Sequence, residues 1–392
     1  MKILFLSRWF PDPPDNGSKI RVLNLLRGLS QYHDVTLLSF SDQPEGSREA
    51  GEVRSICSEV DVVPWREFDP QSLRSRLGYL SMKPRSLVDT FSREMAQKIS
   101  RLLSGKKYDL VIASQLPMAA YHPYFQGVTA VFEELELGLS LGDSVRAADW
   151  HTRIRHAFGW IKLRHYLARL LDSFCAVTVV SEREKDHVRE IFPRFKETLV
   201  IPNCINVDEY KDVHAEPKPR TMIFSGSFRY RVNYEAMVWF IGEVFPLILE
   251  EIPDAEMILT GDHLDLPLPF QKNIHRTGYV NDIREWIAAS TIAVIPLWSG
   301  GGTRFKILEA MAIGTPVVAT SKGAEGLEAR NGEHLLIGDL PKEFAAHVVT
   351  LLRDGALRDR MAMNAREFVK EKYDWSKVMP EFLRLVAHAG AA

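Results

Sequence analysis

Short apolar runs rich in β-branched residues alternate with amphipathic segments of helical spacing along the whole chain. This alternation is typical of parallel sheets, because each connection between parallel strands is a crossover, usually a helix. Strands are predicted in the first half at Lys2–Leu6, Val35–Phe40, Val60–Val63, Leu110–Ala113, Ala130–Phe132, Ala176–Val180 and Thr198–Ile201. Strands are predicted in the second half at Thr221–Ser225, Glu256–Thr260, His275–Tyr279, Ile292–Pro296, Pro316–Ala319 and His334–Ile337. The expected fold class is therefore α/β, with two doubly wound sheets.

The chain has 392 residues, more than one hydrophobic core usually serves, so two domains are expected. Residues 206–220, NVDEYKDVHAEPKPR, are polar and contain prolines, which is typical of a linker. We therefore predict one Rossmann-like domain over residues 1–205 and a second over residues 206–372. Amphipathic spacing with Trp375 and Phe382 predicts helix in the remaining residues.

The composition excludes several classes of protein. A net charge of −2 gives no sign of a nucleic-acid partner. The cysteines Cys57, Cys175 and Cys204 lack the spacing of metal ligands, which argues against a zinc site and against a disulfide framework and fits a reducing cytoplasm. The first apolar run is too short for an export signal, and no stretch approaches the ~18 apolar residues that span a bilayer, so any membrane contact is expected to be peripheral.

Residues 291–327, TIAVIPLWSGGGTRFKILEAMAIGTPVVATSKGAEGL, predict one strand, a glycine turn, a helix and a second strand. The turn contains Gly300, Gly301 and Gly302. The helix is expected over Phe305–Ile313, where Gly314 ends it.

A helix that begins directly after a glycine turn presents unpaired N–H groups, so an anion can bind over Gly301–Thr303. Thr303 is followed by Arg304 and Lys306, whose charges neutralise a diphosphate, and Glu309 lies one turn further, where a carboxylate can accept hydrogen bonds from a ribose diol. The alternative is that the glycines serve packing only and that Lys306 and Glu309 form a surface pair.

Two further loops follow predicted strands, where ligands of parallel sheets bind. After the first strand, Ser18 is expected to cap the helix Lys19–Gln31, and Gly17 beside Asn16 lets a ligand approach closely. After Thr221–Ser225, a glycine is again followed by cations, and the candidate residues are Gly226, Ser227, Arg229 and Arg231. Either loop could instead be a turn with solvated charges. Neither has the spacing of a dinucleotide fingerprint, which disfavours NAD.

From these residues the chain resembles the retaining glycosyltransferases of the GT-B fold, specifically glycosyltransferase family 4. The motifs are MKILFLSRWFPDPPDNGSKIRVLNLLRGLS, VTVVSEREKDHV, LVIPNCINVDEY, IFSGSFRYRVNYEAMVWF and GGGTRFKILEAMAIGTPVVAT. The resemblance implies transfer of a sugar from a nucleotide-sugar donor, bound mainly by the second domain, to a saccharide or lipid-linked acceptor held mainly by the first, across a cleft. It implies no cofactor and no metal, and a final helix, from about residue 373, that crosses back to the first domain.

The sequence departs from the family pattern in several places. The first of two common glutamates falls on Gly301, and a common arginine and lysine align with Ser227 and Val232. Arg304 and Lys306, with help from Arg229 or Arg231, are therefore left to bind the phosphates. In the turn after Asn203, Cys204 replaces a glycine, which is unfavourable if that position needs a positive φ.

Glu133 and Glu134 stand where many relatives carry a histidine. We expect them to orient an acceptor hydroxyl or to stabilise positive charge on the sugar, the alternative being a hydrated loop or helix cap. Both, with Arg304 and Lys306, are the candidate catalytic residues.

A long helix is predicted around residues 146–171. Its cations are Arg146, Arg153, Arg155, Lys162, Arg164 and Arg169. Its apolar positions, Trp150, Ile154, Ala157, Phe158, Ile161, Leu167, Leu170, Leu171 and Phe174, are expected to pack against the first domain. The basic face then either contacts anionic lipid at the inner face of the cytoplasmic membrane or is an ordinary solvated face.

The leading hypothesis is a hexosyltransferase of surface polysaccharide or glycolipid synthesis. A sugar-nucleotide epimerase of the same architecture and a nucleotide-sugar-binding protein without turnover remain as alternatives.

Overall fold

The computed structural model describes residues 1–42, 51–137, 150–195, 197–269, 271–300 and 304–391. They form two compact units. Unit 1 comprises Met1–Pro202 and Met379–Ala392, and unit 2 comprises Asn203–Val378. The expected boundary after residue 205 thus lies next to the observed one, and the return boundary lies within the last helix.

Unit 1 contains a parallel sheet in the order β3-β2-β1-β4-β5-β6-β7. The strands are β1 (Lys2–Ser7), β2 (Asp34–Ser41), β3 (Glu59–Pro64), β4 (Leu110–Ser114), β5 (Ala130–Glu133), β6 (Ala176–Val179) and β7 (Thr198–Val200). Central strands such as β1 and β4 are buried on both faces, which is why they are continuous apolar runs. The strand order reverses between β1 and β4, the place where open α/β sheets bind ligands.

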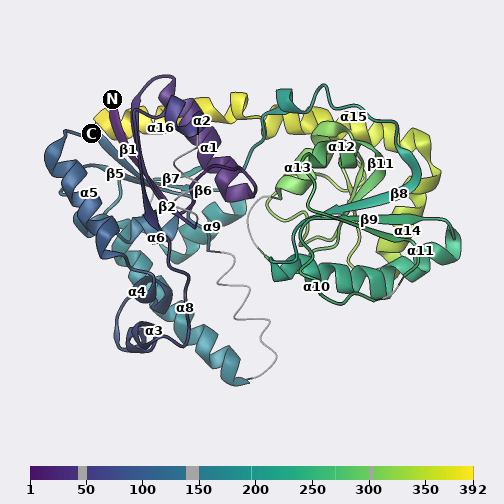
Figure 1. Cartoon of the computed structure of the whole chain (residues 1–392), viewed down its shortest axis with the longest axis horizontal. Helices are drawn as coiled ribbons and strands as arrows, with labels where there is room; N and C mark the ends of the chain where they lie inside the picture. The colour runs from purple at the N-terminus through teal and green to yellow at the C-terminus, as the bar shows by residue number, and fades with distance from the viewer. Residues whose placement is uncertain (43–50, 138–149, 196, 270, 301–303, 392) are drawn as a thin grey trace. The chain divides into compact units, whose positions relative to one another are not determined.

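Helices surround this sheet (Figure 1). They are α1 (Gly17–Ser30), α2 (Gly51–Ile56), α3 (Leu73–Leu77), η2 (Gly78–Leu80), α4 (Arg85–Asp89), α5 (Arg93–Gly105), α6 (Gln115–Ala119), η3 (His122–Tyr124), α8 (Trp150–Leu171), α9 (Glu182–Ile191) and most of α16 (Trp375–Ala391). The helix α16 packs closely on α1, because a Cβ added at Gly28 would lie 2.3 Å from Met379 Sδ.

Unit 2 contains a second parallel sheet, in the order β10-β9-β8-β11-β12-β13. Its strands are β8 (Lys218–Ser225), β9 (Glu256–Thr260), β10 (Ile274–Gly278), β11 (Ser290–Ile295), β12 (Val317–Ala319) and β13 (Leu336–Ile337). Here the order reverses between β8 and β11. Every predicted strand of both domains is confirmed, with ends that differ by a few residues.

The helical elements of unit 2 are η4 (Val207–Glu209), α10 (Arg231–Trp239), η5 (Phe240–Val244), α11 (Phe245–Glu251), α12 (Ile283–Ala288), α13 (Phe305–Ile313), α14 (Pro341–Arg353) and α15 (Gly355–Lys372). The element η5 is a π-helical turn between α10 and α11. Pro246 explains it, since a proline has no N–H and its ring would clash with a carbonyl in a regular α-helix.

One helical stretch, Arg231–Glu251, is long and apolar enough to cross a membrane by length and composition, contrary to the expectation that no stretch comes close. Met237, Phe240, Val244 and Phe245 of this stretch lie in the core of unit 2, which accounts for its apolar character.

Two local predictions are wrong. Ser18 does not cap α1: the cap is Asn16, whose side chain accepts a hydrogen bond from Lys19 N at 3.1 Å. The stretch 206–220 is not a free linker, because Tyr210 is buried in the core of unit 2 and β8 begins at Lys218.

Candidate functional site

The loops that follow β8 and β11 flank the switch point of the unit 2 sheet, and each of them contains a glycine with a positive φ. Gly226 has φ +153°, and a Cβ there would lie 2.7 Å from Asn233 Nδ2 and 3.0 Å from Lys306 Nζ. Gly300 has φ +91°, and a Cβ there would lie 2.8 Å from the Tyr230 hydroxyl. Both positions therefore require glycine, for backbone conformation and for space.

Arg304 and Lys306 stand at the start of α13, as predicted. Arg304 is the residue before the helix, is 7% exposed, and donates from Nη2 to the Ser299 carbonyl at 3.2 Å. Lys306 donates from Nζ to Asn233 Oδ1 at 3.0 Å and lies 4.3 Å from the Phe224 ring centre. Burial first, and the charge of Arg304 second, lower the pKa of Lys306 to about 7. Its ammonium is therefore only partly protonated near neutral pH before an anion binds.

Glu309 lies on α13 one turn beyond Lys306. Its Oε1 accepts a hydrogen bond from the Tyr210 hydroxyl at 3.1 Å. Burial raises the pKa of Glu309 to about 7, against the opposing effects of the Tyr210 hydrogen bond and of the charges of Lys306 and Arg284. Because burial disfavours the ionised form of Glu309, any partner that donates hydrogen bonds to its carboxylate stabilises it.

Asn233 and Tyr210 were not found from the sequence. Asn233 on α10 also donates from Nδ2 to the Ser227 carbonyl at 2.8 Å, so its amide joins the glycine loop after β8 to Lys306. An asparagine inside an apolar helical pattern was the available signal. Tyr210 had none, because its segment reads as linker.

The other predicted cations of unit 2 do not join this cluster. Arg229 pairs with Asp262 at 2.7 Å, and Arg231 pairs with Glu235 at 2.6 Å with 87% of its side chain exposed. The Ser227 hydroxyl donates to the Asp262 carbonyl at 3.1 Å.

Gly301, Gly302 and Thr303 of the predicted anion seat lie outside the described residues, as does Arg146 of the predicted basic helix.

In unit 1 a buried ion pair joins α1 to the carboxyl end of β5. Arg21 and Glu133 are both fully buried, with Nε to Oε1 at 2.7 Å, and the Ser114 hydroxyl donates to Glu133 Oε2 at 2.6 Å. Arg21 Nη1 also donates to the Pro202 carbonyl at 3.1 Å. Glu133 therefore offers no surface to an acceptor, and its predicted direct role is replaced by a structural one: a buried cation requires a paired anion.

Glu134 fits a site better. It is 5% exposed and accepts a hydrogen bond from Gln115 Nε2 at 2.7 Å, and the same nitrogen donates to Ser18 Oγ at 3.3 Å. Burial raises the pKa of Glu134. Gln115 and Glu134 have φ of +68° and +60°, which is unfavourable for residues other than glycine and is found at functional sites. The structure thus brings the predicted Ser18 and Glu134 together through a residue the sequence did not reveal.

The cysteine that replaces a glycine at position 204 causes no strain of the backbone. The residue is fully buried, and it is not among the described residues with a positive φ.

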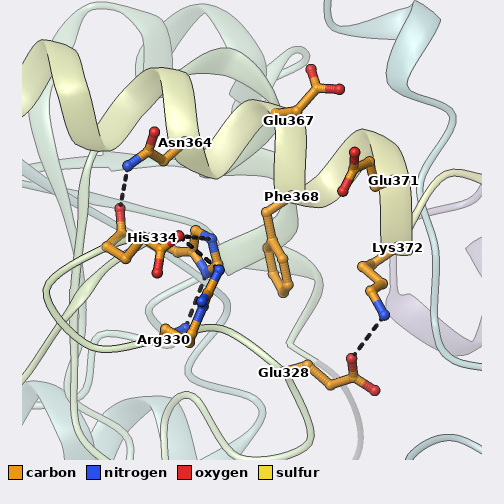
Figure 2. Close-up of a pocket in the computed structure, with 9 residues that line it drawn as sticks. Glu328, Arg330, His334, Asn364, Glu367, Phe368, Glu371 and Lys372 are labelled. Atoms are coloured by element: carbon orange, nitrogen blue, oxygen red, sulfur yellow. Dashed lines mark hydrogen bonds and ion pairs between the residues drawn. The ribbon is translucent and has the colours of Figure 1, made fainter.

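A surface pocket of about 430 Å³ lies elsewhere in unit 2, along α15 (Figure 2). Figure 2 shows Lys372 paired with Glu328 at 3.2 Å and the Phe368 ring beside His334, stacked at 4.3 Å. None of the predicted site residues lines it. Among the described residues, no group of three or more His, Cys, Asp or Glu side chains is arranged to hold a metal ion.

Comparison with known proteins supports the fold and identifies the family. The fold is that of Anabaena HepE, solved in complex with UDP and glucose, with a TM-score of 0.69, 16% identity, and coverage of 99% of this chain and 100% of that one. The fold class is therefore GT-B. Within it, the chain belongs to glycosyltransferase family 4: residues 15–209 match the model described as Glycosyltransferase Family 4 and residues 219–354 the model described as Glycosyl transferases group 1.

Two curated relatives are informative. An uncharacterized 44.6 kDa protein in the cps region of Klebsiella pneumoniae is 20% identical over 98% of this chain and 99% of its own length. A phosphatidyl-myo-inositol mannosyltransferase of Mycobacterium leprae is 31% identical over 48% of this chain and 53% of its own length.

Proposed function

We propose that the protein transfers a hexose-type sugar from a nucleoside diphosphate sugar, of the UDP or GDP type, to a saccharide or lipid-linked acceptor with retention of configuration, in surface polysaccharide or glycolipid synthesis. The observation that carries the proposal is the cluster at the start of α13, where Arg304, Lys306 and Glu309 lie at the switch point of a sheet. The mannosyltransferase relative, whose name indicates a lipid acceptor, supports the glycolipid alternative.

The roles of the donor-site residues follow from the charge that develops on the diphosphate during sugar transfer. When the bond between sugar and diphosphate breaks, negative charge develops on the leaving oxygens, and the buried Arg304 and the half-buried Lys306 stabilise it from fixed positions. A diphosphate also restores the proton on Lys306, because a neighbouring anion raises the pKa of an ammonium. Glu309 binds the nucleoside ribose through the oxygen that Tyr210 does not use.

On the acceptor side, Glu134 is the remaining candidate catalytic residue. Its carboxyl group is held by Gln115 beside Ser18, and it orients the acceptor hydroxyl or stabilises positive charge on the sugar. The donor and acceptor chemistry uses no cofactor and no metal. We place the enzyme in the cytoplasm, at the inner face of the membrane.

The test begins with a thermal-shift panel of UDP, GDP and ADP, which selects the nucleotide. With the matching sugar donor, Arg304→Ala is expected to lower kcat by about 100- to 1,000-fold, as for loss of one transition-state donor. Glu309→Ala is expected to raise donor KM by roughly 10- to 100-fold, because it removes a charged hydrogen bond used in binding. Arg304→Lys serves as the matched control that keeps the charge. Comparable small effects of both alanine variants would refute the assignment, and ligand binding without product would support a binding protein.

A further inference from the structure

The apolar face of α8 is only half covered. Leu167, Leu170 and Leu171, in its last turns, are buried as expected. Ile154, Phe158 and Ile161 are 59%, 56% and 64% exposed, which corrects the prediction that they pack against the domain. Their spacing places them in one stripe on the helix. The spacing correctly predicts which residues share a face of the helix. The first half of α8, however, projects away from the sheet (Figure 1). No other part of the described chain therefore buries this stripe.

A second exposed apolar group lies in the segment α3–η2–α4. Its members are Leu73, Leu77, Tyr79, Leu80 and Met82, with exposed fractions from 48% to 88%. The two groups are neighbours, because Lys162 Nζ, next to Ile161, donates to the Gly78 carbonyl at 2.6 Å. We call them together the α3–α8 apolar surface.

This surface is held in shape by its own polar contacts. Arg85 donates to the Pro70 carbonyl and to Ser75 Oγ at 2.8 Å each and lies 4.0 Å from the Tyr79 ring centre. Buried Asp89 accepts hydrogen bonds from Asp69 N and from the Ser72 hydroxyl. The apolar side chains are therefore presented by an ordered segment. Monomeric proteins rarely expose so many large apolar side chains together unless the surface binds something.

The charges around the surface indicate what binds. Residues 72–86 and 150–171 contain no Asp or Glu. Their cations within the described side chains are Arg74, Arg76, Lys83, Arg85, Lys162, Arg164 and Arg169. Exposed apolar side chains on segments that carry cations and no acids are complementary to an anionic lipid bilayer, since each basic residue near such a surface adds to the attraction.

We infer that the α3–α8 apolar surface docks unit 1 onto anionic phospholipid. The inference rests on the proposed function in one respect only: docking would bring a lipid-linked acceptor to the enzyme. It differs from the membrane contact expected from the sequence, because the exposed apolar side chains of two segments make the contact, and not the basic face of one helix.

The experiment is co-sedimentation of the full chain with vesicles of phosphatidylglycerol and phosphatidylcholine, and of phosphatidylcholine alone. Binding is expected to the anionic vesicles and to fall as salt rises. The double variant Arg76→Glu with Lys83→Glu should weaken it by roughly tenfold or more, from the contribution of each basic residue near the surface. The double variant Leu80→Ser with Phe158→Ser should weaken it by about 10- to 100-fold, from the apolar area removed.

Matched controls come from exposed positions of unit 2: Lys342→Glu with Lys370→Glu, and Leu340→Ser with Met363→Ser. All these side chains are exposed, so folding is expected to be retained. The inference is overturned if the wild-type chain stays in the supernatant at low salt, if the controls weaken binding as much, or if the Leu80 and Phe158 variant instead abolishes a dimer of this chain. Nucleotide thermal shifts should be unchanged in every variant, so a failure of lipid binding and a failure of the proposed function are told apart.

Discussion

At the scale of single residues, Lys306 and Glu309 determine how the donor site responds to pH. Burial lowers the pKa of Lys306 to about 7 and raises the pKa of Glu309 to about 7. Between pH 7 and 10.5 the unfolded chain binds the Lys306 proton and the folded chain does not, so unfolding free energy rises with pH. Between pH 4.5 and 7 only folded Glu309 is protonated, so unfolding free energy falls with rising pH. Burial of the pair is therefore most unfavourable near neutral pH, and a ligand that satisfies both groups relieves it.

Donor binding is accordingly expected to take up protons. At pH 8, Lys306 is mostly neutral in the free enzyme and becomes charged against the diphosphate, while Glu309 is already ionised. We expect uptake close to one proton per nucleotide sugar bound, measured by titration calorimetry in buffers of different ionisation enthalpy. In Lys306→Arg the cation is permanent, so uptake should vanish. Uptake near zero in the wild type would contradict the assignment.

Tyr210 is expected to act as a positioning residue for Glu309. In Tyr210→Phe the hydrogen bond to Oε1 is lost, and we expect donor KM to rise about tenfold with kcat little changed, as for loss of a hydrogen bond to a charged group. The acidic limb of the pH profile of kcat/KM should move to higher pH, because the hydrogen bond lowers the pKa of Glu309.

The matched control is Tyr234→Phe, which removes a hydrogen bond to the Pro267 carbonyl in the same unit. If both variants behaved alike, or if the pH profile stayed fixed, Tyr210 would have no special part in the donor site.

At the scale of elements, α13 is the part of the site that local sequence rules specify best. Gly314 has φ +88° and donates to the Met311 carbonyl at 3.1 Å, while Thr315 N donates to the Ala310 carbonyl at 2.8 Å. These are the two bonds of a Schellman motif, which favours glycine at the left-handed position.

Gly314→Ala is therefore expected to lower the free energy of unfolding by about 1–2 kcal/mol, the strain of an L-residue in the left-handed region. Contact with the Arg366 guanidinium, 2.5 Å from the added Cβ, can only add to this. Urea denaturation measures the effect. Gly105→Ala at the end of α5 is the matched control, because no atom lies within 4 Å of its added Cβ and it is not among the glycines with positive φ. Equal stability of the two variants would show that the cap contributes nothing.

The sequence predicted what depends on local pattern. The strands, α13 and its glycine stop follow from periodicity and backbone preference, so they were predictable. The exposure of Ile154 and Phe158 was not, because periodicity does not say whether a helix face meets a sheet. Glu133 was mistaken for a catalytic residue for the same reason: its ion pair joins residues 21 and 133, a contact between distant segments.

At the scale of the whole molecule, the two units have separate cores, and the predicted donor groups all lie in unit 2. A nucleotide sugar should therefore stabilise unit 2 by linkage, by about 2.7 kcal/mol at 100 times Kd. Hydrogen exchange should show the slowest amides of β8 and β11 slowed about 100-fold at that concentration, with β1 and β4 unchanged. Equal slowing in both units would place donor contacts in unit 1 as well.

Unit 2 is an insertion within unit 1, entered at Asn203 and left inside α16. Its two ends are joined by hydrogen bonds from Ile205 N to the Tyr373 carbonyl and from Trp375 N to the Ile205 carbonyl, at 2.9 and 3.1 Å. During synthesis unit 2 is contiguous and has all its residues as soon as Val378 leaves the ribosome. Unit 1 must wait for Phe382 and Val386, which are fully buried within it. The half that is translated first is thus the half that folds to completion last.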